Sequence, residues 1–280
     1  MAFSKALKYV SAISITATLL AITTISSLSN QPRWSSNLLL FNRLESLRQV
    51  QNSVVGPDFK VHAPGPSKIY FVPGIRGKAL ATTGGSPDSS DGGAYLTINY
   101  KDFFGKDITQ GEVSLWLKKT IEKTIPYRTP IVGIFGTQPY GSQGPTGNEG
   151  YVSISATWND GLSGKEGINF SITQNTSKHE IITINDPDWN SSVIPINQWY
   201  HYRFVWNIKG IQGGTEKMQL WRNDLKIANY TGTIQGIAPP NYSTYTSDEV
   251  RILGNHHLDR HGNRPILYLD ELQVRKFASH

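Results

Sequence analysis

The chain has 280 residues, a formal net charge of +6 and no cysteine, so disulfide scaffolds, thiolate metal sites and cysteine nucleophiles are excluded. The length fits one large β domain or two small domains, and the 11% aromatic and 17% charged residues exclude a wholly disordered chain. Lys and Arg form no stripe, so we expect no nucleic-acid partner and favour an acidic polymer or surface.

The first 29 residues have the pattern of a targeting segment. Lys5 and Lys8 precede an apolar run from Ala12 to Ile25, and small residues follow that run. This pattern predicts a secretory signal peptide. The alternative is an uncleaved membrane anchor helix, which would be the protein's only contact with a membrane. Both interpretations place the remaining chain in a secreted or extracellular surface location.

Residues 30–41 are predicted to be a linker, and residues 42–280 are predicted to form one domain. A weak helical turn is expected near residues 44–50. The sequence shows no internal repeat and no change of composition after residue 60. A second globular domain is therefore not expected.

Short segments with a two-residue alternation of apolar and other side chains follow from residue 59 onward. The segments are 113–118, 151–156, 200–206, 218–221 and 266–274. Asn223 and Asp224 tolerate positive φ, so they predict a hairpin turn. Many short strands separated by turns predict an all-β fold, a two-sheet antiparallel jelly-roll sandwich.

The order of these segments resembles the LamG-like jelly roll of the concanavalin A-like lectin/glucanase superfamily. The resemblance covers about residues 42–278, and it rests on the motifs GKAL at 77–80, EVSLWLK at 112–118, QWYHYRFVW at 198–206, MQLWRNDLKIA at 218–228, RILGN at 251–255 and YLDELQVRKF at 268–277. It implies a two-sheet sandwich with one concave face, and glycan or protein binding more often than catalysis. The sequence departs from the family pattern at Tyr200 and Tyr202 and at its Asn-Asp turn, which leaves ligand specificity open.

A carbohydrate site is predicted from side chains that alternate with apolar residues and therefore face away from the core. Aromatic rings cover the C–H faces of sugars, polar groups fix sugar hydroxyls, and an arginine fork matches a carboxylate or sulfate. The predicted set is Trp116, Tyr151, His201, Arg203, Gln219 and Trp221. Alternation gives the face of a strand but not its sheet, so the other interpretation is a solvated convex face.

One structural calcium ion is the only cofactor considered. Asp270 shares its alternation with Leu272 and Val274, so a buried carboxylate is predicted that needs a cation or several hydrogen bonds. The family resemblance implies calcium at this aspartate, with Asp58 and the carbonyl of Gly77 as partners. The alternative is a carboxylate capped by backbone N–H groups or by an arginine.

A histidine-rich segment lies near the carboxyl end of the chain. Its side chains His256, His257, Asp259 and His261 are types that bind zinc or copper, but their position between two glycines favours a solvated loop. The same loop is an alternative border of the ligand groove.

Three functions are compared. The favoured one is a non-catalytic carbohydrate-binding protein that prefers acidic polysaccharide, because the Glu-x-Asp-x-x-Glu pattern of laminarinase-type hydrolases and the Gly-x-Ser-x-Gly motif are both absent. The first alternative is a polysaccharide lyase acting on a uronic acid polymer, with Arg203 neutralising the substrate carboxylate and His201 or Tyr151 removing a proton. The second alternative is a protein-adhesion domain.

Overall fold

The computed structural model describes residues 36–63, 65, 67–83, 94–99, 102, 104, 108–122, 129–134, 154–159, 165–178, 180–237, 249–253 and 265–277. The predicted signal or anchor segment, Tyr151 and the histidine-rich segment lie outside these residues. Within the described ranges, no helix has the length and apolar character needed to cross a membrane.

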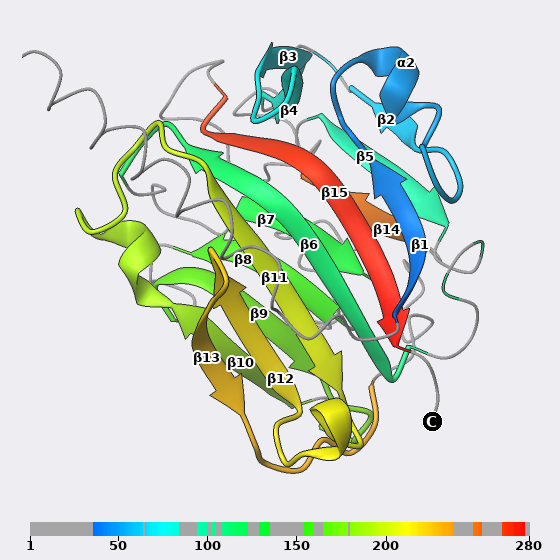
Figure 1. The fold of residues 1–280 in the computed structure, drawn as a ribbon, viewed down its shortest axis with the longest axis vertical. Helices are drawn as coiled ribbons and strands as arrows, with labels where there is room; N and C mark the ends of the chain where they lie inside the picture. The colour runs from blue at the N-terminus through cyan, green and yellow to red at the C-terminus, as the bar shows by residue number, and fades with distance from the viewer. Residues whose placement is uncertain are drawn as a thin grey trace, which may run out of the picture. The chain divides into compact units, whose positions relative to one another are not determined.

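The described strands form two antiparallel sheets, an eight-stranded sheet A and a seven-stranded sheet B (Figure 1). Sheet A runs in the order β13 (Leu225–Tyr230), β12 (Met218–Arg222), β11 (Tyr200–Asn207), β6 (Gln110–Lys119), β15 (Leu267–Phe277), β4 (Lys78–Thr82) and β3 (Ile69–Pro73), and β1 (Ser36–Asn42) also pairs with β15. Sheet B runs in the order β10 (Ile181–Asp186), β9 (Gly167–Thr173), β8 (Ile154–Asn159), β7 (Thr129–Ile134), β14 (Glu249–Ile252), β5 (Tyr95–Asn99) and β2 (Lys60–His62).

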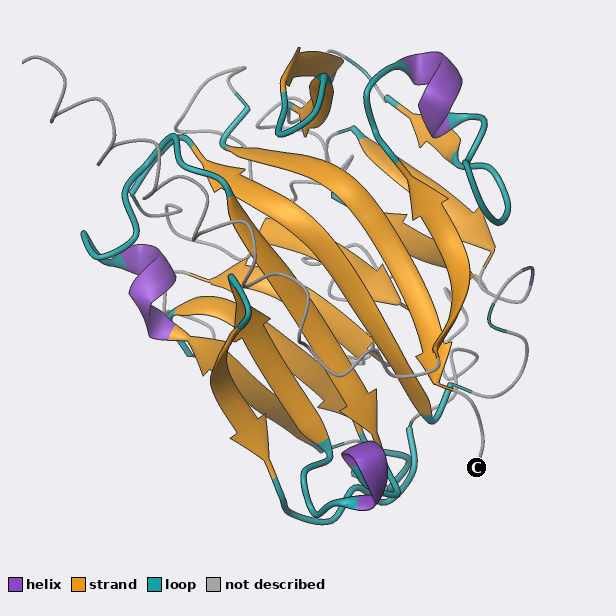
Figure 2. Ribbon diagram, viewed as in Figure 1, coloured by secondary structure: helices purple, strands orange, loops and turns teal. Residues whose placement is uncertain are grey.

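Helices are short in the described part of the chain (Figure 2). They are α2 (Leu47–Val50) and the single-turn helices η3 (Pro187–Asn190) and η4 (Ile211–Gly213). The side chain of Ser46 caps α2 by accepting a hydrogen bond from the backbone N–H of Gln49. The predicted all-β class is therefore confirmed.

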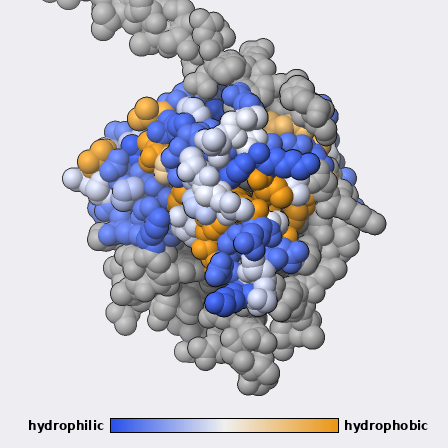
Figure 3. Space-filling view, turned by 90° about the horizontal axis from the view of Figure 1, so that it is seen from below, coloured by the Kyte–Doolittle hydropathy of each residue, from blue (hydrophilic) through white to orange (hydrophobic). Residues whose placement is uncertain are grey.

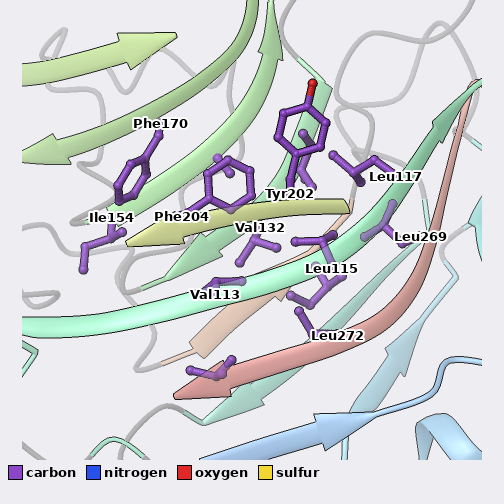
Figure 4. Close-up of a cluster of buried hydrophobic side chains, with 14 of the residues drawn as sticks. Val113, Leu115, Leu117, Val132, Ile154, Phe170, Tyr202, Phe204, Leu269 and Leu272 are labelled. Atoms are coloured by element: carbon purple, nitrogen blue, oxygen red, sulfur yellow. The ribbon is translucent and has the colours of Figure 1, made fainter. Parts of the chain in front are cut away.

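The hydrophobic core contains alternate side chains of both sheets (Figure 4). Val113, Leu115 and Leu117 of β6 and Tyr202 and Phe204 of β11 are each at most 2% exposed. Burying a side chain of this size contributes roughly 1.5–3 kcal/mol to folding. The predicted alternation of these two strands is confirmed, so the residues between them face the opposite side of sheet A.

The predicted hairpin joins β12 to β13. Asn223 and Asp224 have φ angles of 46° and 64°. Positive φ at both central residues is the requirement of a type I′ turn, whose twist matches that of the flanking strands. The turn therefore pairs β12, with Trp221 near its end, with β13.

The predicted linker over residues 30–41 includes a structured part. Residues 36–42 form β1, which pairs with β15 in sheet A, and Leu40 is completely buried. Three consecutive leucines in SNLLLFN supply enough apolar surface for a buried strand. In the sequence alone, an apolar run of this length does not distinguish a strand from a linker.

A register shift in β15 gives Asp270 an orientation that differs from the predicted one. Pairing with β6 changes register between Asp270 and Gln273, and Glu271 has a φ of 49°. The core side chains are therefore Leu267, Leu269, Leu272 and Val274. Because the extra residue changes the alternation, Asp270 lies on the face opposite to Leu272 and Val274 instead of sharing theirs.

Hydrophobic side chains form separate small areas among hydrophilic ones on the end of the protein seen from below (Figure 3). In this view the described residues show no broad apolar patch of the kind that marks a protein interface.

Candidate functional site on the outer face of sheet A

The side of sheet A that faces away from the core is called the outer face. It brings together five of the six residues predicted for carbohydrate binding. His201 pairs with Trp116 across β11 and β6, and Arg203 pairs with Trp221 across β11 and β12. Gln219 lies two residues before Trp221 on the same side of β12. The structure thus assigns these five residues to three adjacent strands.

Tyr151, the sixth predicted residue, lies outside the described residues. The strand that follows it, β8, belongs to sheet B. Of the predicted lyase residues Tyr151, His201 and Arg203, the structure therefore describes only His201 and Arg203, which both lie on β11.

Aromatic rings on the outer face contact polar side chains. The ring centroids of Trp116 and His201 are 5.1 Å apart, and the two planes are tilted by 38°. The guanidinium carbon of Arg203 lies 5.4 Å from the ring centroid of Trp221, a cation–π geometry. The indole Nε1 of Trp221 donates to Oε1 of Gln219 at 2.9 Å. These contacts fix both tryptophan rings before any ligand binds.

Arg203 is held by a carboxylate of the protein itself. Its Nε donates to Glu112 Oε1 at 3.2 Å, and its Nη2 donates to Glu112 Oε2 at 2.9 Å. The two side chains are only 18% and 10% exposed, so this bidentate pair is well shielded. The arginine fork that the sequence suggested for a ligand carboxylate is therefore engaged by Glu112.

His201 lies in a partly buried environment that favours its neutral form. Burial lowers the pKa of His201, and the carboxylate of Asp224 only partly opposes this effect. A neutral imidazole has one N–H donor and one acceptor nitrogen. At neutral pH the ring therefore suits hydrogen bonds to hydroxyl groups better than pairing with an anion.

A second cluster on the outer face was not singled out from the sequence. The Nζ atom of Lys118 lies 4.9 Å from the ring centroid of Trp199 and 4.8 Å from that of Tyr268. The alternation of β6 already placed Lys118 on the same side as Trp116. Simple alternation along β15 predicts Tyr268 on the same face as Leu272, but the register shift places the two side chains on opposite faces. Trp199 lies just before the first residue of β11.

The oxygen atoms predicted to bind calcium accept hydrogen bonds from backbone N–H groups. The Asp270 carboxylate accepts hydrogen bonds from the backbone N–H groups of Ile75 and Glu271, at 2.8 and 2.9 Å. The carbonyl of Gly77 accepts from the N–H of Gly74 at 3.0 Å, and Asp58 accepts from Ser53 at 2.8 Å.

Backbone N–H groups therefore use part of the acceptor capacity of the oxygens that a calcium ion would need, and calcium at Asp270 stays a prediction. Across the described ranges, no group of three or more His, Asp or Glu side chains is arranged to hold a metal. The arrangement agrees with the alternative in which backbone N–H groups cap Asp270.

Gly74 allows this capping. A Cβ atom at that position would lie 2.5 Å from Oδ2 of Asp270. The turn between β3 and β4 can therefore approach the carboxylate only with glycine there.

No family model matches the chain, and no curated protein sequence matches it. Similar folds occur among solved structures of botulinum neurotoxins. One is a structure of the type C neurotoxin, whose cell entry depends on interaction with two ganglioside molecules. Its TM-score is 0.57 and its identity is 11%, and the match covers 86% of this chain and 48% of that one. A serotype D ligand-binding domain in complex with N-acetylneuraminic acid has a TM-score of 0.54 and 12% identity, with coverage of 86% and 48%.

A third similar structure, the binding domain of the DC neurotoxin in complex with rat synaptotagmin II, has a TM-score of 0.54 and 11% identity, with coverage of 86% and 49%. The chain thus spans about half the length of these structures. At these identities the likeness shows a shared all-β fold, and the fold by itself assigns no ligand.

Proposed function

We propose that the chain is a non-catalytic carbohydrate-binding protein with a LamG-like, concanavalin A-like jelly roll, and that the outer face of sheet A binds the glycan. The observation that carries this proposal is the juxtaposition of Trp116, His201, Arg203 and Trp221 on adjacent strands. Aromatic rings suit the C–H faces of sugars, and the polar groups between them suit sugar hydroxyls.

An acidic polysaccharide is the favoured ligand class. The formal net charge of +6 attracts a polyanion. The similar structures include domains whose descriptions name gangliosides and N-acetylneuraminic acid as their ligands. In this proposal residues 1–29 deliver the protein to the extracellular side.

The engagement of Arg203 favours binding over elimination chemistry. A lyase needs a free cation beside the substrate carboxylate, to stabilise the negative charge that develops when the neighbouring proton is removed. The fork of Arg203 instead binds Glu112 through two hydrogen bonds. We therefore assign Arg203 to the positioning of Trp221.

The test is a binding screen of the purified full chain against neutral and acidic polysaccharides. Loss of one stacking ring should weaken binding by roughly 2- to 12-fold, so we expect this loss for Trp116→Ala and for Trp221→Ala. Tyr95→Ala is the matched control, because Tyr95 lies on sheet B, where it stacks on His62.

Undiminished binding by both tryptophan variants would reject the outer face as the site. A rise in ultraviolet absorbance on incubation with a uronic acid polymer would replace the proposal with the lyase. Capture of a specific protein that added glycans do not displace, with no glycan bound, would replace it with adhesion.

A further inference from the structure

Lys118 differs from Arg203 and Lys226, two other cations on the outer face of sheet A, in what surrounds its charge. Arg203 pairs with Glu112, and Lys226 pairs with Glu216. Lys118 instead has two aromatic neighbours, and no carboxylate of the described residues is within ion-pair distance of it. Its charge is therefore positioned without being neutralised by the described part of the protein.

The three residues of this cluster form a row across the sheet. Lys118 pairs directly with Tyr268 across β6 and β15, and Trp199 immediately precedes β11, whose first residue pairs with Leu117. All three side chains are half-buried. Trp116, two residues from Lys118 on the same side of β6, continues the aromatic surface toward His201.

Ring faces attract an ammonium group but leave its positive charge in place. Partial burial removes some of the water that would otherwise solvate that charge, and it lowers the pKa of Lys118 from its ordinary value. An incoming anion restores the lost solvation through a charge-assisted hydrogen bond. The aromatic rings beside the ammonium can meanwhile contact the apolar face of the sugar that carries the anion.

We propose that Lys118, Trp199 and Tyr268 form a subsite for the acidic group of a sugar residue. This inference rests on the proposed function, since it names the part of the outer face that makes binding selective for charged glycans. The acidic group is a carboxylate or a sulfate, which share a negative charge and acceptor oxygens. Arg203 does not perform this role, because its fork is bound to Glu112.

The experiment compares affinities of the full chain for a carboxylated, a sulfated and a neutral polysaccharide, using alginate, dextran sulfate and dextran. Lys118→Met removes the charge and keeps an unbranched side chain. We expect it to weaken binding to the charged polymers by about 10- to 100-fold, the loss associated with a hydrogen bond to a charged group. Lys118→Arg should restore most of the affinity.

Lys226→Met is the matched control, since it removes one positive charge from β13, an edge strand of the same sheet that is separated from β6 by β11 and β12. It should change affinity by less than about threefold. Equal losses in the Lys118 and Lys226 variants would mean that only overall charge matters, and would overturn the subsite. The stronger of the alginate and dextran sulfate signals identifies the acidic group.

Failure of the subsite and failure of the proposed function give different results. If the native chain binds dextran as well as the charged polymers and Lys118→Met binds normally, the subsite is rejected and carbohydrate binding stands. If the native chain binds no glycan, both are rejected. If Lys118→Met fails to fold, the subsite is tested by acylation of lysines in the native protein. Bound polyanion should protect Lys118 from the reagent. Unchanged labelling of Lys118 would overturn the subsite.

Discussion

Asp270 is a completely buried carboxylate held by backbone N–H groups. Burial raises its pKa to about 6, and the hydrogen bonds from Ile75, Glu271 and Arg76 only partly offset this effect. The unfolded chain has the ordinary aspartate pKa of about 3.9. The folded protein therefore binds a proton at this site more tightly than the unfolded chain does.

The free energy of unfolding should depend on pH through this residue. Between about pH 4 and pH 6 the folded state holds more protons than the unfolded state, so the contribution of Asp270 is largest below pH 4 and is lost as pH rises through 6. Urea unfolding of the native chain and of Asp270→Asn across pH 4 to 8 checks this. The variant should lack this part of the slope, so the stability of the native chain relative to the variant should fall as pH rises from 4 through 6, and identical slopes would contradict the assignment.

At the scale of the elements, one polar cluster joins an end of sheet B to sheet A. Asp186 ends β10 and caps η3 by accepting from the backbone N–H of Asp188. Its fully buried carboxylate also accepts from the Tyr202 hydroxyl at 2.7 Å and from Nη1 of Arg222 at 2.7 and 2.9 Å. Burial raises the pKa of Tyr202 well above its ordinary value, so the hydroxyl remains a donor.

Breaking this cluster should be costly because Arg222 would keep a partly buried charge without its main partner. We expect Asp186→Ala to lower the free energy of unfolding by about 3–5 kcal/mol. Lys226→Met removes the more exposed pair with Glu216 and should cost less than about 1 kcal/mol. Denaturant unfolding of both variants measures the difference, and similar small losses would show that Asp186 does not fasten the two sheets.

Local patterns predicted the strands and the β12–β13 turn, because alternation and Asn-Asp turn chemistry act over a few residues. They did not predict the register shift in β15, since Asp270 is fixed by the N–H of Ile75, which lies 195 positions away in the sequence. The outward face of Arg203 was likewise predictable. Its pairing with Glu112 depends on cross-strand register between residues 91 positions apart, which the sequence does not encode locally.

At the scale of the whole described fold, the strand nearest the carboxyl end is central. β15 pairs with β6 on one side and with β4 and β1 on the other. Leu267, Leu269, Leu272 and Val274 of this strand belong to the core. β15 is therefore needed to join β1, β3 and β4 to the rest of sheet A.

A chain shortened to residues 1–265 should fail to fold cooperatively, because it loses the four core side chains together with hydrogen bonds on both sides of β15. Removing only residues 278–280 keeps β15 whole and should leave the free energy of unfolding within about 0.5 kcal/mol of that of the native chain. Circular dichroism and limited proteolysis of the two truncated chains distinguish them. A protease-resistant 1–265 chain would contradict the central role of β15.

The position of β15 has a consequence for how the protein is made. A ribosome releases β1 early and β15 late, so during most of translation β6 and β1 present open edges that wait for the same missing strand. Completion of sheet A must therefore follow release of residues 267–277, so the two parts of the sheet on either side of β15 are joined only at that late step of synthesis.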